Sequence, residues 1–75
     1  MFTQEQVREY WGNGKTIEVE GTKYDFHRMS YGDYFLEPIT WKGGETDGFS
    51  KNTIWLEKVL KANQYGFKQV YYKLP

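Results

Sequence analysis

The chain lacks cysteine and has a single histidine, His27, so neither a disulfide framework nor a thiolate zinc site is available to it. One imidazole does not hold a metal ion by itself, and we predict no metal and no cofactor. A chain of 75 residues is expected to form one domain, and a domain of this size buries only about 60 % of the surface that its unfolded form exposes. Its stability must therefore come from side-chain packing.

Net charge and long apolar runs are also missing. Ten Lys and Arg residues balance ten Asp and Glu residues, which removes the bulk attraction that draws a basic protein to nucleic acid. No apolar run reaches the roughly 18 residues of a membrane span, and no charged start leads into an apolar signal segment. We therefore expect a cytoplasmic protein that does not bind membranes.

Aromatic side chains are the residues in excess. Three Trp, seven Tyr and five Phe make up 20 % of the chain, and each buries on the order of 150 to 250 Å² when it lies inside a protein. Tyrosine keeps a polar tip and is enriched at interfaces. We expect part of this aromatic surface to be exposed.

Residues 3–11 carry the signals of a short helix. Thr3 is a good N-cap, and Gln6, three residues later, completes a capping box. Gly12 and then Asn13-Gly14 predict the end of the helix, because these residues readily adopt the left-handed conformation of a helix stop. At about eight residues, such a helix must dock on other elements to be stable.

The stretch from Lys15 to Trp41 predicts three short strands joined by two tight turns. Apolar and polar residues alternate along it, so one face of the first hairpin should carry Ile17, Val19, Tyr24 and Phe26. In the third strand, Pro38 cannot donate to the ladder. We therefore expect a bulge at Glu37-Pro38 that lets both Leu36 and Ile39 point inward.

A glycine-rich loop is predicted from Lys42 to Gly48, with no apolar residue in it, and we expect it to be the most mobile part of the chain. Its glycine spacing matches neither a P-loop nor a dinucleotide fingerprint, and its acidic residues Glu45 and Asp47 would repel phosphate. We do not expect a phosphate site here.

A second, longer helix is predicted from Ser50, because Leu56, Val59, Leu60 and Asn63 follow at helical spacing. Gly66 would end it, and residues 67–74 alternate as a final strand. The fold class is therefore α+β: a single domain over residues 1–75, in the order α-β-β-β-α-β. An antiparallel three-stranded meander plus a fourth strand would form one sheet, with the long helix packed on one face. The edge at which the last strand joins stays open.

Catalysis is not the expected activity. His27 is the only histidine that could act as a base, with Asp25 on the same side of its strand to orient the ring. A surface histidine on an exposed strand face explains the same pattern. Paired carboxylates for acid and base work need a pocket between them, and a filled interior of this size leaves little room for one. We predict that the chain is not an enzyme.

Exposed aromatics beside cations are typical of two functions. A protein interface uses Tyr, Trp and Arg as anchors, whereas a single-stranded nucleic-acid module stacks bases on aromatics while lysines follow the backbone. The first hypothesis, docking on a larger protein, assigns the partner-binding residues Arg28, Tyr31, Tyr34, Trp41 and Tyr71, with the loop from Lys42 to Gly48 as a rim. The alternative assigns nucleic-acid binding to Lys58, Lys61, Lys68 and Lys73, which lie where no acid follows Glu57. A homodimer is a third possibility.

No segment carries the signature of a named family. In its size and its tyrosine content the chain resembles the small accessory proteins encoded by bacteriophages and mobile elements, several of which bind and inhibit a host enzyme or an immune nuclease. The resemblance implies a stoichiometric inhibitor, which needs no catalytic residues. The sequence leaves open the partner, the oligomeric state and whether a small molecule binds against the sheet.

Overall fold

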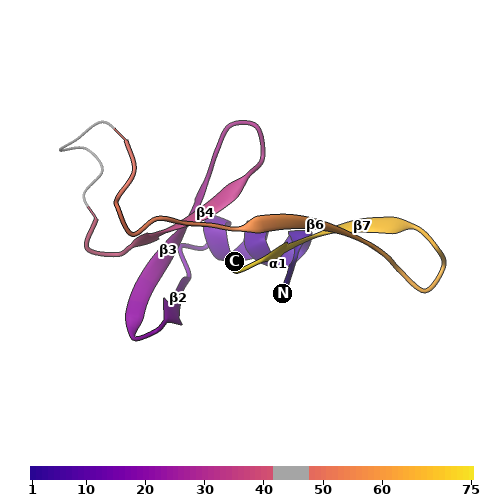
Figure 1. Cartoon of the computed structure of the whole chain (residues 1–75), viewed down its shortest axis with the longest axis horizontal. Helices are drawn as coiled ribbons and strands as arrows, with labels where there is room; N and C mark the ends of the chain where they lie inside the picture. The colour runs from indigo at the N-terminus through magenta and orange to yellow at the C-terminus, as the bar shows by residue number, and fades with distance from the viewer. Residues whose placement is uncertain (42–47) are drawn as a thin grey trace.

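The computed structural model describes residues 1–41 and 48–75 and shows a small α+β fold with one helix and two antiparallel sheets (Figure 1). The elements in chain order are β1 (Phe2–Thr3), α1 (Gln4–Gly12), β2 (Thr16–Val19), β3 (Thr22–Arg28), β4 (Tyr34–Pro38), β5 (Ile54–Trp55), β6 (Glu57–Ala62) and β7 (Lys68–Lys73). One sheet has the strand order β2-β3-β4-β5 and the other β1-β7-β6. The predicted α+β class is confirmed, but the predicted element order is wrong.

Helix α1 begins and ends where the sequence predicts. The Thr3 hydroxyl accepts from the Gln6 N–H at 3.1 Å, and the Gln6 side chain accepts from the Thr3 N–H at 2.8 Å, which completes the capping box. Asn13 caps the other end, where its N–H donates to the carbonyl of Glu9 at 3.0 Å. The helix fastens to the fold through Val7, which is fully buried. Across residues 1–41 and 48–75, no helix is both long and apolar enough to cross a membrane.

The hairpin of β2 and β3 also follows local sequence signals. Glu20 and Gly21 both have positive φ, 49° and 83°, as a tight two-residue hairpin turn requires. Ile17 then lies opposite Tyr24, so the apolar face is the predicted one. Adjacent to that pair, on the other face, Glu18 lies opposite Lys23. Opposite charges at directly paired positions favour this register.

Strand β4 pairs with β3 residue for residue from Tyr34 to Pro38, so the predicted bulge at Glu37-Pro38 is wrong. The Ile39 N–H donates to the Lys23 carbonyl just beyond Pro38. Hydrogen bonding alternates along an antiparallel strand, so the nitrogen of Pro38 points away from β3. Strand β5 does not reach that position, and no ladder bond is lost there. Ile39, which was expected to point inward, is half exposed.

The second predicted helix does not form, and its residues are strands β5 and β6. Its expected apolar stripe is not a packing stripe, because Leu56 is buried whereas Leu60 is 61 % exposed. Strand β6 instead pairs with β7 along its whole length. This hairpin pairing across the Asn63 turn outweighs the weak helical periodicity of the segment.

The last strand does not extend the meander. Strand β7 lies between β1 and β6 in a sheet of its own, so the predicted single four-stranded sheet that included it is wrong. The two sheets nevertheless share one core, whose buried members are Val7, Tyr24, Phe26, Tyr34, Leu36, Leu56 and Tyr72. The rings of Tyr34 and Tyr72 meet edge to face at 5.2 Å, and the Tyr72 hydroxyl donates to the Gly32 carbonyl.

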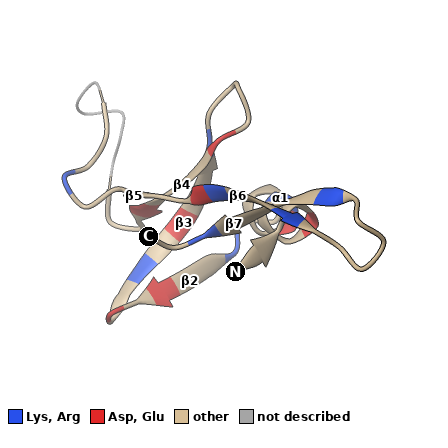
Figure 2. Ribbon diagram, turned by 45° about the vertical axis from the view of Figure 1, so that its right-hand side comes forward, with Lys and Arg blue, Asp and Glu red and all other residues tan. Residues whose placement is uncertain are grey.

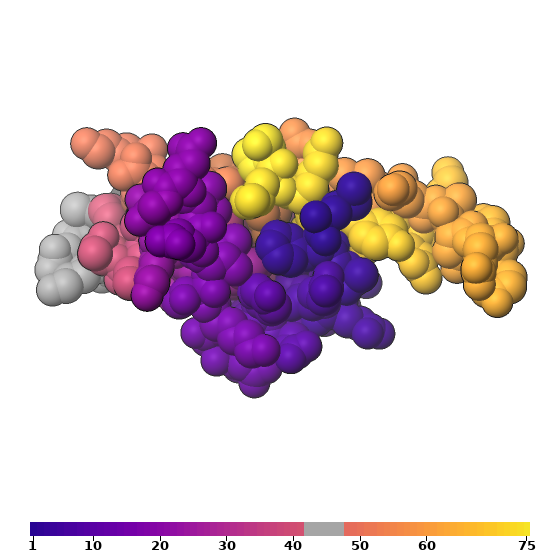
Figure 3. Space-filling view, turned by 90° about the horizontal axis from the view of Figure 1, so that it is seen from below, coloured from indigo at the N-terminus to yellow at the C-terminus, as the bar shows by residue number. Residues whose placement is uncertain are grey.

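The molecule is elongated. Its radius of gyration is 13.4 Å, whereas a compact domain of this length is expected near about 11 Å. The principal extents are 47 × 27 × 23 Å. The hairpin of β6 and β7 forms one end of the long axis and projects past the N-terminal segment (Figures 1 and 3). The shared core therefore supports only the base of this hairpin.

The core assignment predicts unequal costs for two leucine truncations. Leu36→Ala should lower the free energy of unfolding by about 3 kcal/mol, because Leu36 is fully buried and its removal leaves a cavity. Leu60→Ala should cost less than about 0.5 kcal/mol, since that side chain is mostly in water. Urea denaturation followed by circular dichroism measures both. Equal costs would place Leu60 in the core and contradict the projecting hairpin.

Candidate protein-docking surface

Large apolar side chains are exposed along the projecting hairpin. Leu60, Tyr65 and Phe67 are 61, 74 and 70 % exposed, in a strand and turn that reach beyond the shared core. Val59 and Val70 on the same hairpin are half-buried. Large rings held in water at the end of a rigid element are typical of anchor residues in protein interfaces. Leu60 lies opposite Val70 on the face that carries Tyr72, apart from the turn, so we call only Tyr65 and Phe67 the hairpin tip cluster.

Asn63 builds the turn that displays this cluster. Its side-chain oxygen accepts from the N–H groups of Tyr65 and Phe67 at 2.9 and 3.0 Å. Its backbone N–H donates to the Phe67 carbonyl at 2.8 Å, and Gly66, with φ of 84°, donates back to the Asn63 carbonyl. A turn held by four hydrogen bonds is ordered before a partner arrives, which lowers the entropy cost of binding.

The four lysines of the nucleic-acid alternative do not share a face. The register places Lys58 and Lys68 on the face that carries Tyr72, and Lys61 and Lys73 on the face that carries Tyr71. Two of them are ion-paired at 3.3 Å, Lys58 with Asp33 and Lys73 with Glu57. Basic and acidic segments accordingly lie together at the start of β6 (Figure 2). The hairpin therefore offers no continuous basic stripe of the kind a phosphate backbone binds.

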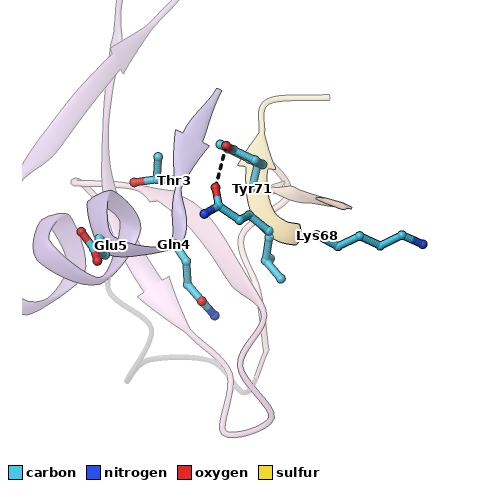
Figure 4. A pocket seen from close by; sticks show the side chains of 7 residues that line it. Thr3, Gln4, Glu5, Lys68 and Tyr71 are labelled. Atoms are coloured by element: carbon cyan, nitrogen blue, oxygen red, sulfur yellow. Dashed lines mark hydrogen bonds between the residues drawn. The ribbon is translucent and has the colours of Figure 1, made fainter. Parts of the chain in front are cut away.

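A groove of about 440 Å³ runs beneath the hairpin, between β7 and the start of α1 (Figure 4). Thr3 and Glu5 line one side; Lys68, Val70 and Tyr71 line the other. Strand β1 pairs with β7 only at Tyr71 and the residue after it. Backbone hydrogen bonds point alternately to the two sides of a strand. Because the Phe67 carbonyl accepts from the Asn63 N–H, the N–H and C=O groups of Lys68 and Val70 point away from β6. They face the side of β7 that β1 leaves uncovered. Such an edge is a template for an added strand.

Two of the predicted contact tyrosines have different environments. Tyr34 is only 3 % exposed and packs on Tyr72 in the core, so its ring is not available to a partner in this fold. Tyr71 is half-buried, lines the groove and donates from its hydroxyl to Gln69 at 3.1 Å (Figure 4). Of the two, only Tyr71 lies on the hairpin surface.

The remaining predicted contact residues lie elsewhere. The Arg28 guanidinium sits 5.6 Å from the Trp11 ring centre, and Tyr31 is 65 % exposed in the turn between β3 and β4. Trp41 lines a pocket on the outer face of the four-stranded sheet. The structure therefore does not bring the predicted set together. The predicted rim from Lys42 to Gly48 lies outside the described residues except for Gly48.

Sequence reasoning missed the hairpin tip cluster. The run Asn63-Gln64-Tyr65-Gly66 between two segments of β-branched and aromatic residues is a hairpin signal. Gly66 also fits the end of a helix, and that interpretation hides the turn and its exposed rings.

No protein-family model matches the chain, and comparisons with curated proteins and with solved structures give no match either. Its function therefore has to be inferred from its own surface.

Removal of the Asn63 side chain should loosen the tip without unfolding the protein. Asn63→Ala deletes the acceptor for two backbone N–H groups, which is worth about 1 kcal/mol of local stability at an exposed turn. Amide hydrogen exchange at Tyr65 and Phe67 should become about fivefold faster. Gln64→Ala, in the same turn, is the control and should leave these rates unchanged. Unchanged exchange in Asn63→Ala would show that the turn is not held by this side chain.

Proposed function

We propose that this chain is a small, non-catalytic binding protein that docks on a larger protein through the β6–β7 hairpin. The observation that carries the proposal is the hairpin tip cluster: Tyr65 and Phe67 are 74 and 70 % exposed on a turn that Asn63 orders. Aromatic anchors that are already held in place bind with little loss of entropy. The groove beside β7 would lengthen the contact with main-chain hydrogen bonds.

The more specific form of this proposal is an inhibitor of a host enzyme or defence nuclease, as expected from the resemblance to phage and mobile-element proteins. A narrow hairpin that extends the molecule to 47 Å along one axis suits insertion into a concave site. Projecting loops of other binding proteins enter concave epitopes in this way. An inhibitor of this kind would work in the cytoplasm at one copy per target and would require no chemistry of its own.

The alternative is a single-stranded nucleic-acid module on the same hairpin. Its support is the pairing of exposed rings with cations, since Phe67 directly precedes Lys68 and is 70 % exposed. The ion pairs of Lys58 and Lys73 reduce the positive charge available to phosphates. Salt separates the two functions, because phosphate contacts weaken steeply with ionic strength whereas an aromatic protein interface responds weakly.

The test is a pull-down with the full chain from nuclease-treated host-cell lysate, followed by affinity measurement on the captured protein. The double variant Tyr65→Ala/Phe67→Ala should weaken binding by at least about 2 kcal/mol, or about 30-fold in Kd, as removal of interface anchors does. Both side chains are mostly exposed, so the variant should keep its circular dichroism spectrum and unfolding midpoint.

Tyr31→Ala is the matched control, because Tyr31 is equally exposed but lies in the turn between β3 and β4. It should leave the affinity unchanged. Loss of binding in Tyr31→Ala, with full binding by the hairpin variant, would move the site to that turn. Capture only of nucleic acid, with a steep salt dependence that Lys61→Gln and Lys68→Gln reduce, would support the alternative.

A further inference from the structure

The outer face of the four-stranded sheet carries a row of aromatic rings. His27, Phe35 and Trp55 lie directly opposite one another on β3, β4 and β5. The His27 ring stacks on Phe35 at 5.3 Å, and Trp55 lies 4.7 Å from Phe35 on its other side. Phe49 covers the row with its ring at 89° to Phe35 and 5.1 Å away. This cluster is separate from the hydrophobic core, which uses the other face of β4.

Beside the rings is a pocket of about 220 Å³ with a carboxylate in its wall. His27, Phe35, Trp41 and Phe49 line it together with Glu37. Pockets for drug-sized ligands run to about 300 to 1,000 Å³, so this one suits a single small group. We call it the aromatic pocket.

Glu37 is the buried charged group of this face. It is only 3 % exposed, and both of its oxygens accept hydrogen bonds: one from the Ser50 N–H at 3.1 Å and the other from the Thr53 hydroxyl. The two oxygens of a carboxylate offer about four acceptor positions in all. Glu37 therefore retains capacity for a further donor or a cation.

A second carboxylate lies next to it. Asp25 is directly opposite Glu37 in the β3–β4 register and on the same face of the sheet. Like charges at directly paired positions destabilise a sheet. Within residues 1–41 and 48–75 the ion pairs engage Glu9, Asp33 and Glu57, and neither Asp25 nor Glu37 forms one there. A buried carboxylate of this kind is stabilised by a cation.

We propose that the aromatic pocket binds an organic ammonium ion. Ring faces attract cations through their quadrupole, and quaternary or methylated ammonium groups are recognised in this way. Glu37, in the wall of the pocket, supplies the opposite charge, and Asp25 lies opposite it in the sheet. A metal ion fits less well, because the residues described contain no group of three His, Cys, Asp or Glu side chains placed to hold one. The site lies on the four-stranded sheet and does not depend on the docking hairpin.

The ammonium group could be presented by a free small molecule such as choline or by a methylated lysine in a peptide, and the chemistry of recognition is shared. The test begins with choline, titrated into the full chain at constant ionic strength. Nuclear magnetic resonance follows the indole N–H signals of Trp41 and Trp55. We expect saturable shifts, with the Trp41 signal moving most because Trp41 lines the pocket.

The matched ligand control is the neutral tert-butyl analogue of choline, in which carbon replaces the quaternary nitrogen. It has the same shape but no charge, so it should bind at least about tenfold more weakly. Equal affinity for choline and this analogue would overturn the proposal, because it would show an apolar pocket that is indifferent to charge. Shifts confined to residues outside the pocket would do the same.

Glu37→Gln is the matched protein variant and should weaken choline binding about tenfold. The substituted amide oxygen still accepts from the Ser50 N–H, and the amide nitrogen donates to the Thr53 hydroxyl, which in turn donates to the Ser50 carbonyl. The local turn is thereby preserved. Glu57→Gln, at an exposed acid in the other sheet, should leave the affinity unchanged.

Phe49→Leu keeps the test decisive if Glu37→Gln unfolds, because Phe49 is half exposed and its ring is not in the shared core. It should also weaken choline binding. Unchanged affinity in every folded pocket variant would overturn the proposal. A peptide with trimethyllysine, compared with its tert-butyl-bearing counterpart, distinguishes the sources: tighter binding than choline indicates a modified protein, and binding no tighter than choline indicates a free small molecule.

Discussion

Burial of β4 on both of its faces is the constraint on which the structure depends. All five of its residues are buried, although a chain of this length has little material with which to cover a strand twice. One face, with Tyr34 and Leu36, is covered by α1 and Tyr72. The other, with Phe35 and Glu37, is covered by Phe49, Trp55 and the turn that Glu37 anchors. The first face is fully covered only because Tyr72 of the second sheet packs on it. The residues that cover the other face form the aromatic pocket.

The elongated shape follows from this arrangement. The core reaches β7 at Tyr72. Val70 lies on the same face two residues nearer the turn and is only half-buried. Beyond that point β6 and β7 are held by each other and by the Asn63 turn. Exposed rings on such an extension add little to folding stability. Their presence is better explained by a contact made outside the monomer, which is the physical reason for favouring a docking function.

Local signals predicted part of the fold well. The capping box of Thr3, the helix stop at Asn13 and the turn at Glu20-Gly21 each depend on residues within a few positions, and all three form as expected. The prediction failed after Ser50, where the apolar residues fit a helix and a strand alike. Val59 and Leu60 suit a helix as well as a strand, and their pairing with β7 decides between them. The bulge predicted at Pro38 does not form, because β5 ends before it reaches Pro38 and no hydrogen bond is lost there. The sequence does not show where β5 ends.

Candidate site residues were predicted less well, because tyrosine occurs both inside and outside this protein. Tyr72 is buried with its hydroxyl satisfied at the Gly32 carbonyl, and Tyr34 packs beside it; Tyr65 has the same composition signal and is 74 % exposed. Alternation assigns each ring to a face but does not say how far along a strand the core extends. The core ends partway along β7, so Tyr72 is buried whereas Val70, on the same face, is only half-buried. Burial of these side chains therefore follows from their position relative to the shared core rather than from residue type.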